Sequence, residues 1–526
     1  MKKFTLFLFT LVIGFITFCT LVVKADAITI TLTEAASIRP AGNQGLRFAA
    51  TASEDFDGNT EHGFYIAIGR HTKAEMTAAI AGGTGSIGGH TIVKKDTRGT
   101  DKDFAVTVID IPEANYGTEI TAIAYYVHED ANVYSNVAFA SNFITVAKTL
   151  VDGGSENATY VAIANTAKVT VTATDSSVRY YATIDNQLII EDYDTITLAA
   201  GTYSNNFTVS ANHVTIEGNK EFNLKHNDEY IVSGDDSIFN CVVTITGDYF
   251  DLSSVVFSKK IDLNGADHTA IHNCVTTTTN ATYPYAIGTV GSESSYLTVT
   301  NVAVAGTVNR FIYGYSAVLN GLTVDSCCVL DSADMDKDTS LGVCDFIRLG
   351  QSEENKSKGI ITIQNCYIRA FQSGFQDRNP GGNQYNFLNN YYYNIPNAIY
   401  AKSVSTKTGI VYNVMYNTFN SCLKSYAGWD VVEIDPSVSK TVNINYNAFA
   451  NTGTRPSCYS ISVLGTATVD CTNNYFKAGA DRVVNLVTPT DWSLEEAITD
   501  GNTYDAYKIV QIGGKYYISS VNLNAE

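Results

Sequence analysis

The sequence predicts an all-β protein: a right-handed parallel β-helix preceded by a small β-sandwich-like domain. Between residues 269 and 476 one phrase recurs, an alternating apolar strand followed by Asn and two or three bulky residues. A repeat of this size, built from strands and turns rather than helices, is typical of a parallel β-solenoid. One rung cannot bury its own apolar face, so successive rungs are expected to stack about 4.8 Å apart.

The recurring Asn residues are expected to form a ladder along the axis, because stacked side-chain amides can hydrogen-bond to one another. Cysteine follows the ladder position in three phrases, which suits a small buried hydrophobe. The aligned positions are Asn273, Asn301, Ser326, Asn365, Asn390, Asn417, Asn447 and Asn474, with steps of 28, 25, 39, 25, 27, 30 and 27 residues. The long step contains an insertion, about 331–359, which predicts loops on one face of the solenoid.

The first 27 residues read as a secretory signal peptide, with Lys2 and Lys3, an apolar run over 4–23 and the cleavage phrase Ala25-Asp26-Ala27. The run is also long enough to remain as a membrane anchor, which is the alternative. No second such run follows, so we expect a secreted, extracellular protein without a membrane span after signal removal, and a monomer.

The formal net charge of −19 excludes a general nucleic-acid binder and disfavours unaided binding of polyanions, but it permits calcium. All ten cysteines except Cys19 lie at or after Cys241, and they form no C-x-x-C pair. Buried free thiols are therefore expected rather than a disulfide framework or a zinc site.

Four regions follow the signal: a β-sandwich-like accessory domain (28–150), a linker with a small β-rich segment (151–179), the parallel β-helix (180–480) and a C-terminal cap (481–526). The opening of the first, ASIRPAGNQGLRF (36–48) with EHGFYI (61–66), resembles a β-sandwich module attached to secreted bacterial proteins, for which carbohydrate binding is one hypothesis. The segment DTITLAAGTYSNNFTVSANHVTIEG (194–218) resembles the first coil of the pectin-lyase-like superfamily.

Counting forward from each ladder Asn identifies residues that share a phase on successive coils. Lys424 and Arg455 fall seven or eight places on, and a second column falls twelve or thirteen places on. Its members are Asp377 with Arg378, Lys402, Trp429 and Tyr459. These columns would flank a groove in which rings stack on sugars and cations meet uronate carboxylates. The alternative interpretation is that all of them are ordinary solvated turn residues.

Three successive phrases resemble coils of pectate lyases: VYNVMYNTFNSCLKSYAG (411–428), VNINYNAFANTGTRP (442–456) and TVDCTNNYF (468–476). The resemblance implies catalytic roles for Lys424 and Arg455 in removing a proton next to a carboxylate. This chain departs from the family at Ser457, where the base arginine is expected. The calcium-binding aspartates of the preceding coil are not evident either, which leaves calcium as a possible cofactor only.

Two phrases resemble those of pectin methylesterases: CDFIRLGQ (344–351), through Asp345, and FQDR (375–378) one coil later. Phrases typical of polygalacturonases are missing, and the histidines form no readable triad. Two main hypotheses remain: a lyase-like enzyme on an acidic glycan, and a non-catalytic surface, adhesion or glycan-binding solenoid. A carbohydrate esterase is the third.

Overall fold

The computed structural model describes residues 28–39, 44–185, 188–279, 284–333, 344–350, 352, 354–403, 407–420, 422, 430–436, 439–450, 461–463, 467–471, 474–477, 484–485, 491–492, 508–512 and 515–519. The chain forms two compact units that meet in sequence between Ala164 and Asn165. Each unit is described by itself below.

The first unit contains two antiparallel sheets. The first sheet pairs β3 (Gly45–Ala52) with β1 (Ile30–Leu32), β2 (Ser37–Arg39) and β8 (Asp103–Ile109). The second has the order β10 (Ala131–Tyr134), β9 (Ile120–His128), β4 (His62–Ile68), β7 (Val93–Thr97), with β11 (Phe139–Ser141) also paired to β9. Helix α2 (Lys73–Ala81), the hairpin β5 (Ser86–Ile87) and β6 (His90–Thr91), and the 3-10 turn η1 (Glu113–Asn115) complete the strand region.

Two helices end the first unit, α3 (Phe143–Asp152) and α4 (Ala158–Ala164), where the sequence predicted a linker and β-structure. The reason is capping: the Asn142 side chain accepts the backbone N–H of Thr145 at 2.8 Å, and Gly153 ends α3. The β-branched residues inside α3 favour a strand locally, but its buried face, which includes Phe143 and Ile144, selects the helix.

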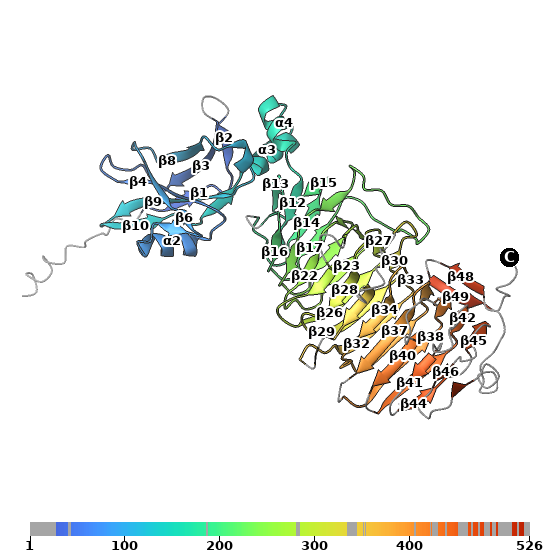
Figure 1. Ribbon diagram of the computed structural model, residues 1–526. Helices are drawn as coiled ribbons and strands as arrows, with labels where there is room; N and C mark the ends of the chain where they lie inside the picture. Colours follow the sequence, from blue (N-terminus) through green and yellow to red (C-terminus); the bar gives the residue numbers. More distant parts are fainter. Residues whose placement is uncertain are drawn as a thin grey trace, which may run out of the picture. The chain divides into compact units, whose positions relative to one another are not determined.

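The second unit is a right-handed parallel β-helix, which confirms the predicted fold class (Figure 1). Three sheets, here named D, E and F, run along it, and each coil passes through them in that order. Sheet D contains β13 (Val178–Tyr181), β12 (Val169–Thr172), β14 (Thr195–Leu198), β17 (Thr215–Glu217), β20 (Asp251–Ser253), β23 (Ala270–His272), β26 (Ser294–Thr300), β29 (Leu319–Asp325), β32 (Lys358–Gln364), β35 (Gln384–Leu388), β38 (Ile410–Met415), β41 (Lys440–Asn445) and β44 (Ala467–Asp470).

Sheets E and F complete the coils. Sheet E contains β15 (Gly201–Tyr203), β18 (Ser237–Phe239), β21 (Val256–Phe257), β24 (Val275–Thr276), β27 (Ala303–Val304), β30 (Cys328–Val329), β33 (Tyr367–Arg369), β36 (Tyr391–Tyr393), β39 (Thr418–Asn420), β42 (Ala448–Ala450) and β45 (Tyr475–Lys477). Sheet F contains β16 (Phe207–Val209), β19 (Val243–Ile245), β22 (Ile261–Leu263), β25 (Ile287–Thr289), β28 (Arg310–Gly314), β31 (Asp345–Leu349), β34 (Ser373–Asp377), β37 (Asn397–Ser403), β40 (Val432–Pro436), β43 (Ile461–Val463), β46 (Val484–Asn485) and β47 (Asp491–Trp492).

The ends of the β-helix depart from the parallel pattern. At the first coil, β12 pairs antiparallel with both β13 and β14. Near the other end β46 and β47 are antiparallel, and β48 (Lys508–Ile512) forms a hairpin with β49 (Lys515–Ser519). Both strands lie within the region predicted as the C-terminal cap, 481–526.

The asparagine ladder is real, but it consists of two columns rather than one. The first column has left-handed backbone at the turn from sheet D to sheet E, with positive φ at Asn273, Asn301, Ser326, Asn365 and Asn389. The Asn389 side chain donates to that of Asn365 at 2.8 Å. The predicted alignment of Asn365 with Asn390 is therefore wrong by one residue, because two consecutive asparagines occur at this point in the sequence.

The second column begins at Asn390, one place further along, and is fully buried. The side-chain amide of each member donates to the next. Asn390 donates to Asn417 at 3.0 Å, Asn417 donates to Asn447 at 3.1 Å, and Asn447 donates to Asn474 at 3.0 Å. In earlier coils, cysteine occupies the equivalent place directly after the left-handed residue. Cys274, Cys327 and Cys366 are buried there, as predicted.

The 39-residue step is not a simple loop insertion. It contains β31, a regular strand of sheet F whose neighbours are β28 and β34. The coil is long on both sides of this strand, and residues 334–343 lie outside the described part. The correction matters because β31 carries two charged residues of the candidate site.

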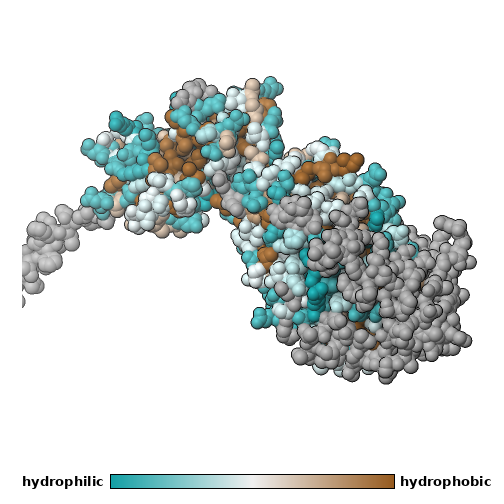
Figure 2. All heavy atoms as spheres, viewed as in Figure 1, coloured by the Kyte–Doolittle hydropathy of each residue, from teal (hydrophilic) through white to brown (hydrophobic). Residues whose placement is uncertain are grey.

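The outer faces of the three sheets have different surroundings. Residues 218–236, here called the strap, connect β17 to β18 and cover part of sheet E, where Phe222 packs among Val256, Val275 and Ala303. The outer face of sheet F carries charged and aromatic residues, and much of the outer face of sheet D is partly exposed. In the view of Figure 2, the described surface of the second unit is mostly hydrophilic or neutral, with one compact hydrophobic patch near its upper edge.

Candidate functional site

The strongest concentration of chemistry in the described residues lies on sheet F. Backbone register pairs Arg310 with Asp345, and Tyr313 with Arg348, on the adjacent strands β28 and β31. Between these positions Ile312 and Ile347 point into the core. Because side chains alternate along a strand, Tyr313 and Arg348 lie on the outer face.

Two guanidinium groups share one carboxylate in this arginine–aspartate cluster, which comprises Arg310, Asp345 and Arg348. Asp345 Oδ2 lies 3.2 Å from Arg348 Nη1 and 3.8 Å from Arg310 Nε. The three residues are 9%, 1% and 5% exposed for Arg310, Asp345 and Arg348. Two cations against one anion leave the cluster with one excess positive charge and with guanidinium N–H groups to spare.

Two tyrosines lie over the arginines. The Arg310 guanidinium carbon is 4.8 Å from the ring centroid of Tyr313, and that of Arg348 is 4.6 Å from the ring of Tyr315. Both tyrosines are partly exposed. Cation–π contacts of this length stabilise a desolvated cation. The site therefore consists of the buried, charged arginine–aspartate cluster, covered by the partly exposed rings of Tyr313 and Tyr315.

Burial sets the electrostatics of the cluster. It raises the pKa of Asp345, and the charges of Arg348 and Arg310 oppose that rise. Burial lowers the pKa of Arg310, and the like charge of Arg348 lowers it further. The Nε groups of both arginines have no hydrogen-bond partner among the described residues. A buried donor without a partner costs free energy, so the described residues do not fully satisfy the two guanidinium groups.

The same face continues over neighbouring coils. Toward the N-terminal coils, the ring of Tyr285 stacks on Tyr313 with centroids 5.3 Å apart, and its hydroxyl donates to Asp262 at 2.8 Å. Lys260 pairs with Asp262 at 2.6 Å. In the other direction, Gln376 pairs in register with Arg348. Charged and aromatic side chains thus follow one another from β22 to β31, and the polar Gln376 continues the face on β34.

One of the residues predicted from phase, Arg378, lies at this face, and the backbone of a second, Lys402, occupies the equivalent place on the next coil. Arg378 directly follows β34, is exposed, and donates from Nε to Gln376 at 3.2 Å. Register pairs Asp377 with Ala401, so the residues that follow them, Arg378 and Lys402, occupy equivalent places on neighbouring coils. The predicted phase is correct here, although the Lys402 side chain lies outside the described part.

The other predicted residues, Lys424, Trp429, Arg455 and Tyr459, lie outside the described residues. In sequence, Lys424 falls between β39 and β40, and Arg455 between β42 and β43. Both connections therefore run from sheet E to sheet F. Their roles stay predictions.

Asp377 does not lie on the surface. Its side chain has no exposed area and accepts hydrogen bonds from Ser357 at 2.5 Å, from Tyr385 at 3.1 Å and from the backbone of Asn379 at 3.0 Å. It follows the outward-facing Gln376, so the alternation of the strand turns it inward. Phase counting located the correct turn but could not tell these two directions apart.

Sequence reasoning also missed the pairing of Arg310 with Asp345. The phrases RFIYG (310–314) and DFIRLG (345–350) share Phe-Ile at the same distance from their first residue, and aligning them would have paired the two charges. The asparagine alignment does not use this signal, because the predicted insertion, about 331–359, includes the DFIRLG phrase itself.

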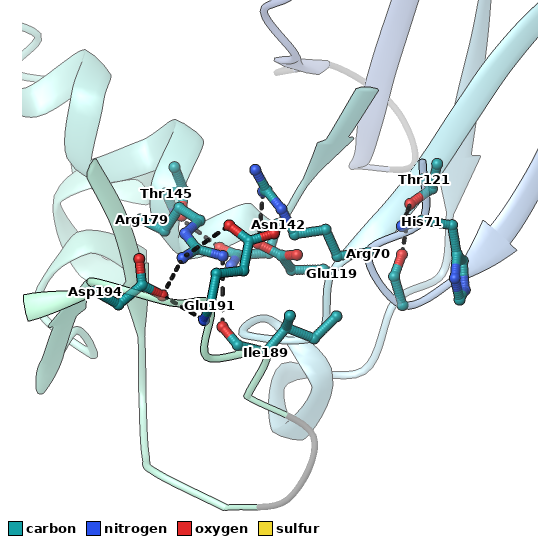
Figure 3. Close-up of polar contacts among 11 residues, drawn as sticks. Arg70, His71, Glu119, Thr121, Asn142, Thr145, Arg179, Ile189, Glu191 and Asp194 are labelled. Atoms are coloured by element: carbon teal, nitrogen blue, oxygen red, sulfur yellow. Dashed lines mark hydrogen bonds and ion pairs between the residues drawn. The ribbon is translucent and has the colours of Figure 1, made fainter. Parts of the chain in front are cut away.

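Other polar contacts in Figure 3 are explained by structure alone. Within the β-helix, buried Arg179 pairs with Asp194 at 2.8 Å, and Asp194 also accepts the backbone N–H of Glu191. Within the first unit, Arg70 faces the nearly buried carboxylate of Glu119 at 3.6 Å. These contacts hold turns next to strands.

The chain matches no protein-family model, no curated protein and no solved structure, so the functional argument depends on the geometry of the site.

Two further findings bear on the site and on the chain. Across the described residues, no group of three or more His, Cys, Asp and Glu side chains is arranged to hold a metal ion. Within that same part, no helix has both the length and the apolar character that a membrane crossing requires.

Proposed function

We propose that this protein is a secreted, extracellular polysaccharide-active member of the pectin-lyase-like superfamily, and that it acts in a lyase-like manner on an acidic glycan. The glycan would lie along the outer face of sheet F, over the arginine–aspartate cluster. The observation that carries the proposal is that two buried guanidinium groups share one carboxylate beneath partly exposed tyrosine rings.

The charge pattern favours an acidic ligand. The chain has a net charge of −19, so an anionic polymer needs a local cationic site. Arg310 and Arg348 supply one, because their two guanidinium groups share the single carboxylate of Asp345. Tyr313 and Tyr315 offer ring surface to the apolar faces of the sugar.

Elimination requires a cation on the uronate carboxylate and a base for the neighbouring carbon-bound proton. In this proposal Arg348 and Arg310 neutralise the carboxylate, which stabilises the carbanion-like transition state. Lys424 and Arg455, by resemblance to pectate lyases, are the candidates for the base. Arg378, Lys402, Trp429 and Tyr459 would contact flanking sugars.

Calcium enters only as a possible partner of the glycan carboxylate. The described residues provide no cluster of three or more metal-binding side chains, so they define no calcium site and no step depends on the ion.

The test is incubation with a panel of acidic and neutral glycans, followed by ultraviolet absorbance of the unsaturated products. Arg348→Ala should lower turnover by about 10²–10³-fold, as the loss of one transition-state donor does. Lys424→Ala or Arg455→Ala should cost about 10²–10⁴-fold if either is the base. Lys358→Ala, which removes an exposed pair with Glu293 on sheet D, is the matched control and should retain activity.

A non-catalytic glycan-binding or adhesion protein is the second candidate. It is favoured by the burial of the cluster, because binding needs a stable cationic surface but no mobile base. Retention of acidic glycans without unsaturated products, lost in Arg348→Ala, would select this function.

A carbohydrate esterase is the third candidate. It is favoured by one observation, the register that sets Gln376 of the FQDR phrase beside Arg348, next to Asp345. Release of an alcohol or acetate from an esterified glycan, without unsaturated products, would select it.

A further inference from the structure

Sheet D carries a surface that the proposed function does not use. Strands β32, β35, β38 and β41 pair in continuous parallel register. Their inward residues, such as Tyr385, Tyr412 and Val442, belong to the interior core. The outward residues form the surface here called the D face: Ile360, Thr362, Gln364, Gln384, Asn386, Leu388, Val411, Asn413, Met415, Thr441, Asn443 and Asn445.

None of these twelve residues is charged, although the whole chain has a net charge of −19. Lys358, the first residue of β32, pairs with Glu293 at 2.6 Å beside the face. A carboxylate lies next in register on each side, since Gln364 pairs with Asp325 on β29 and Asn443 pairs with Asp470 on β44. Charged side chains are mostly found at exposed positions, but they are depleted at the centres of binding interfaces. Most of the D-face side chains are partly or fully exposed, with Ile360 at 53%.

An ordered amide ladder runs across the centre of this face. The side-chain amide of Asn443 donates to Asn413 at 2.9 Å, Asn413 donates to Asn386 at 2.8 Å, and Asn386 donates to Thr362 at 3.1 Å. An asparagine amide has two N–H donors. Each of the three amides donates one N–H within the ladder, and its second N–H can donate to a ligand. These second N–H groups recur at every coil, about 4.8 Å apart.

We propose that the D face binds a neutral polysaccharide in an extended or sheet-like form. The amides and hydroxyls of the ladder would meet sugar hydroxyls, which both donate and accept. Ile360, Leu388, Val411 and Met415 would pack against the apolar C–H faces of the rings. The face spans four strands, which corresponds to about 14 Å along the axis between the outermost strands.

Charge selects this occupant over two others. An acidic glycan finds no cation among the D-face residues, and the neighbouring Lys358 is already paired with Glu293. A second copy of the chain would bring its own charge of −19 close to the first. A neutral polymer meets neither obstacle. The proposal does not depend on the chemistry proposed for sheet F, because the two surfaces lie on different sheets.

The experiment is a depletion assay of the purified protein with microcrystalline cellulose, insoluble mannan and chitin as neutral probes, and soluble polygalacturonate as the acidic one. The wild type should be retained by at least one neutral probe. Asn413→Asp places an unpaired charge at the centre of the face and should weaken retention by about tenfold or more. Thr298→Asp, in the same outward column of sheet D but two coils upstream of β32, should bind as the wild type does.

A second variant covers the case in which Asn413→Asp fails to fold. Thr441→Asp lies at an exposed position on β41 and should give the same loss, with a circular dichroism melt unchanged from the wild type. The proposal is overturned if no neutral probe retains the wild type, or if both variants bind normally. It is also overturned if Arg348→Ala abolishes neutral binding, or if sedimentation shows a dimer that Thr441→Asp dissociates.

Discussion

Asp377 shows how one residue can depart from what its neighbours suggest. It lies between the outward-facing Gln376 and the exposed Arg378, but it is fully buried and bonded to Ser357 and Tyr385. Burial raises the pKa of Asp377 to about 6 from an ordinary 3.8, and its three hydrogen bonds only partly offset that rise. An inward carboxyl of this kind belongs to the packing of the coil rather than to ligand binding.

The stability of the β-helix should therefore depend on the protonation of Asp377. The pKa of Asp377 is raised in the folded state, so the protonated carboxyl is favoured there. Its contribution to the free energy of unfolding is therefore full below about pH 4 and is lost as the pH rises through about 6. The unfolding free energy should fall by about 3 kcal/mol over that interval because of this group. Asp377→Asn keeps an acceptor for Ser357 but cannot ionise.

Thermal melts of both proteins from pH 4 to pH 7 would test this. The melting temperature of the wild type should fall relative to that of Asp377→Asn as the pH rises. Parallel profiles over the whole interval would show that Asp377 is already ionised at pH 4 in the folded protein, contrary to the expectation.

At the scale of elements, local signals predicted what depends on short-range chemistry and missed what depends on packing across coils. The alternating strands and the left-handed turn residues were readable, because each rung repeats them. The predicted alignment of the ladder is displaced by one residue at Asn389-Asn390, because the sequence cannot show which of two consecutive asparagines faces inward. Helix α3 was not predicted, because its β-branched residues give no strong local helix signal and its conformation depends on the Asn142 cap and on its buried face.

The strap is a second element that composition alone could not locate. Its only guide in the sequence is the long interval between β17 and β18, and its path depends on apolar partners several coils away. The His226 ring stacks on Tyr367 with centroids 3.9 Å apart, and Cys328 Sγ lies 3.3 Å from the carbonyl oxygen of Leu224. The strap thus covers a thiol on the outer face of sheet E.

This arrangement makes Cys328 a reporter of the strap. In the native protein all described cysteines should resist a thiol reagent, because they are buried. The double variant Phe222→Ala/His226→Ala removes two of the strap side chains that pack on sheet E and on Tyr367, and it should render Cys328 reactive. Peptide mapping should find Cys274 and Cys366, which lie inside the solenoid, still unlabelled.

The matched control is Lys225→Ala, an exchange within the strap that removes neither contact. Labelling of Cys274 and Cys366 together with Cys328 would mean that the coils themselves had opened. Rapid labelling of most cysteines in the wild type would contradict the buried-stack interpretation altogether.

At the scale of the whole molecule, the β-helix followed from the period of the sequence, because one repeated phrase imposes one repeated coil. The candidate site did not follow, because charges such as Arg310 and Asp345 meet only through the spacing between coils. That spacing varies: the coil of β31 is longer than its neighbours, and counting from one asparagine to the next cannot show where within it the strand falls. The backbone pairing between coils must therefore be known before counting residues from the ladder asparagines can identify a site.

The two units should also be separable. The interior core of the β-helix draws its buried residues from Val169 onward, while the cluster around Tyr65, Met76 and Tyr125 lies wholly in the first unit. Each unit therefore buries its own apolar surface, which is the main requirement for independent folding.

Limited proteolysis should cut between the helices, at 153–157, or near 165–168, and should leave two stable pieces. Residues 28–164 and 165–526 expressed separately should each melt cooperatively. Retention of glycans should stay with the second fragment, since sheets D and F both belong to it. A single resistant core, or loss of folding in either fragment, would show that the units depend on each other.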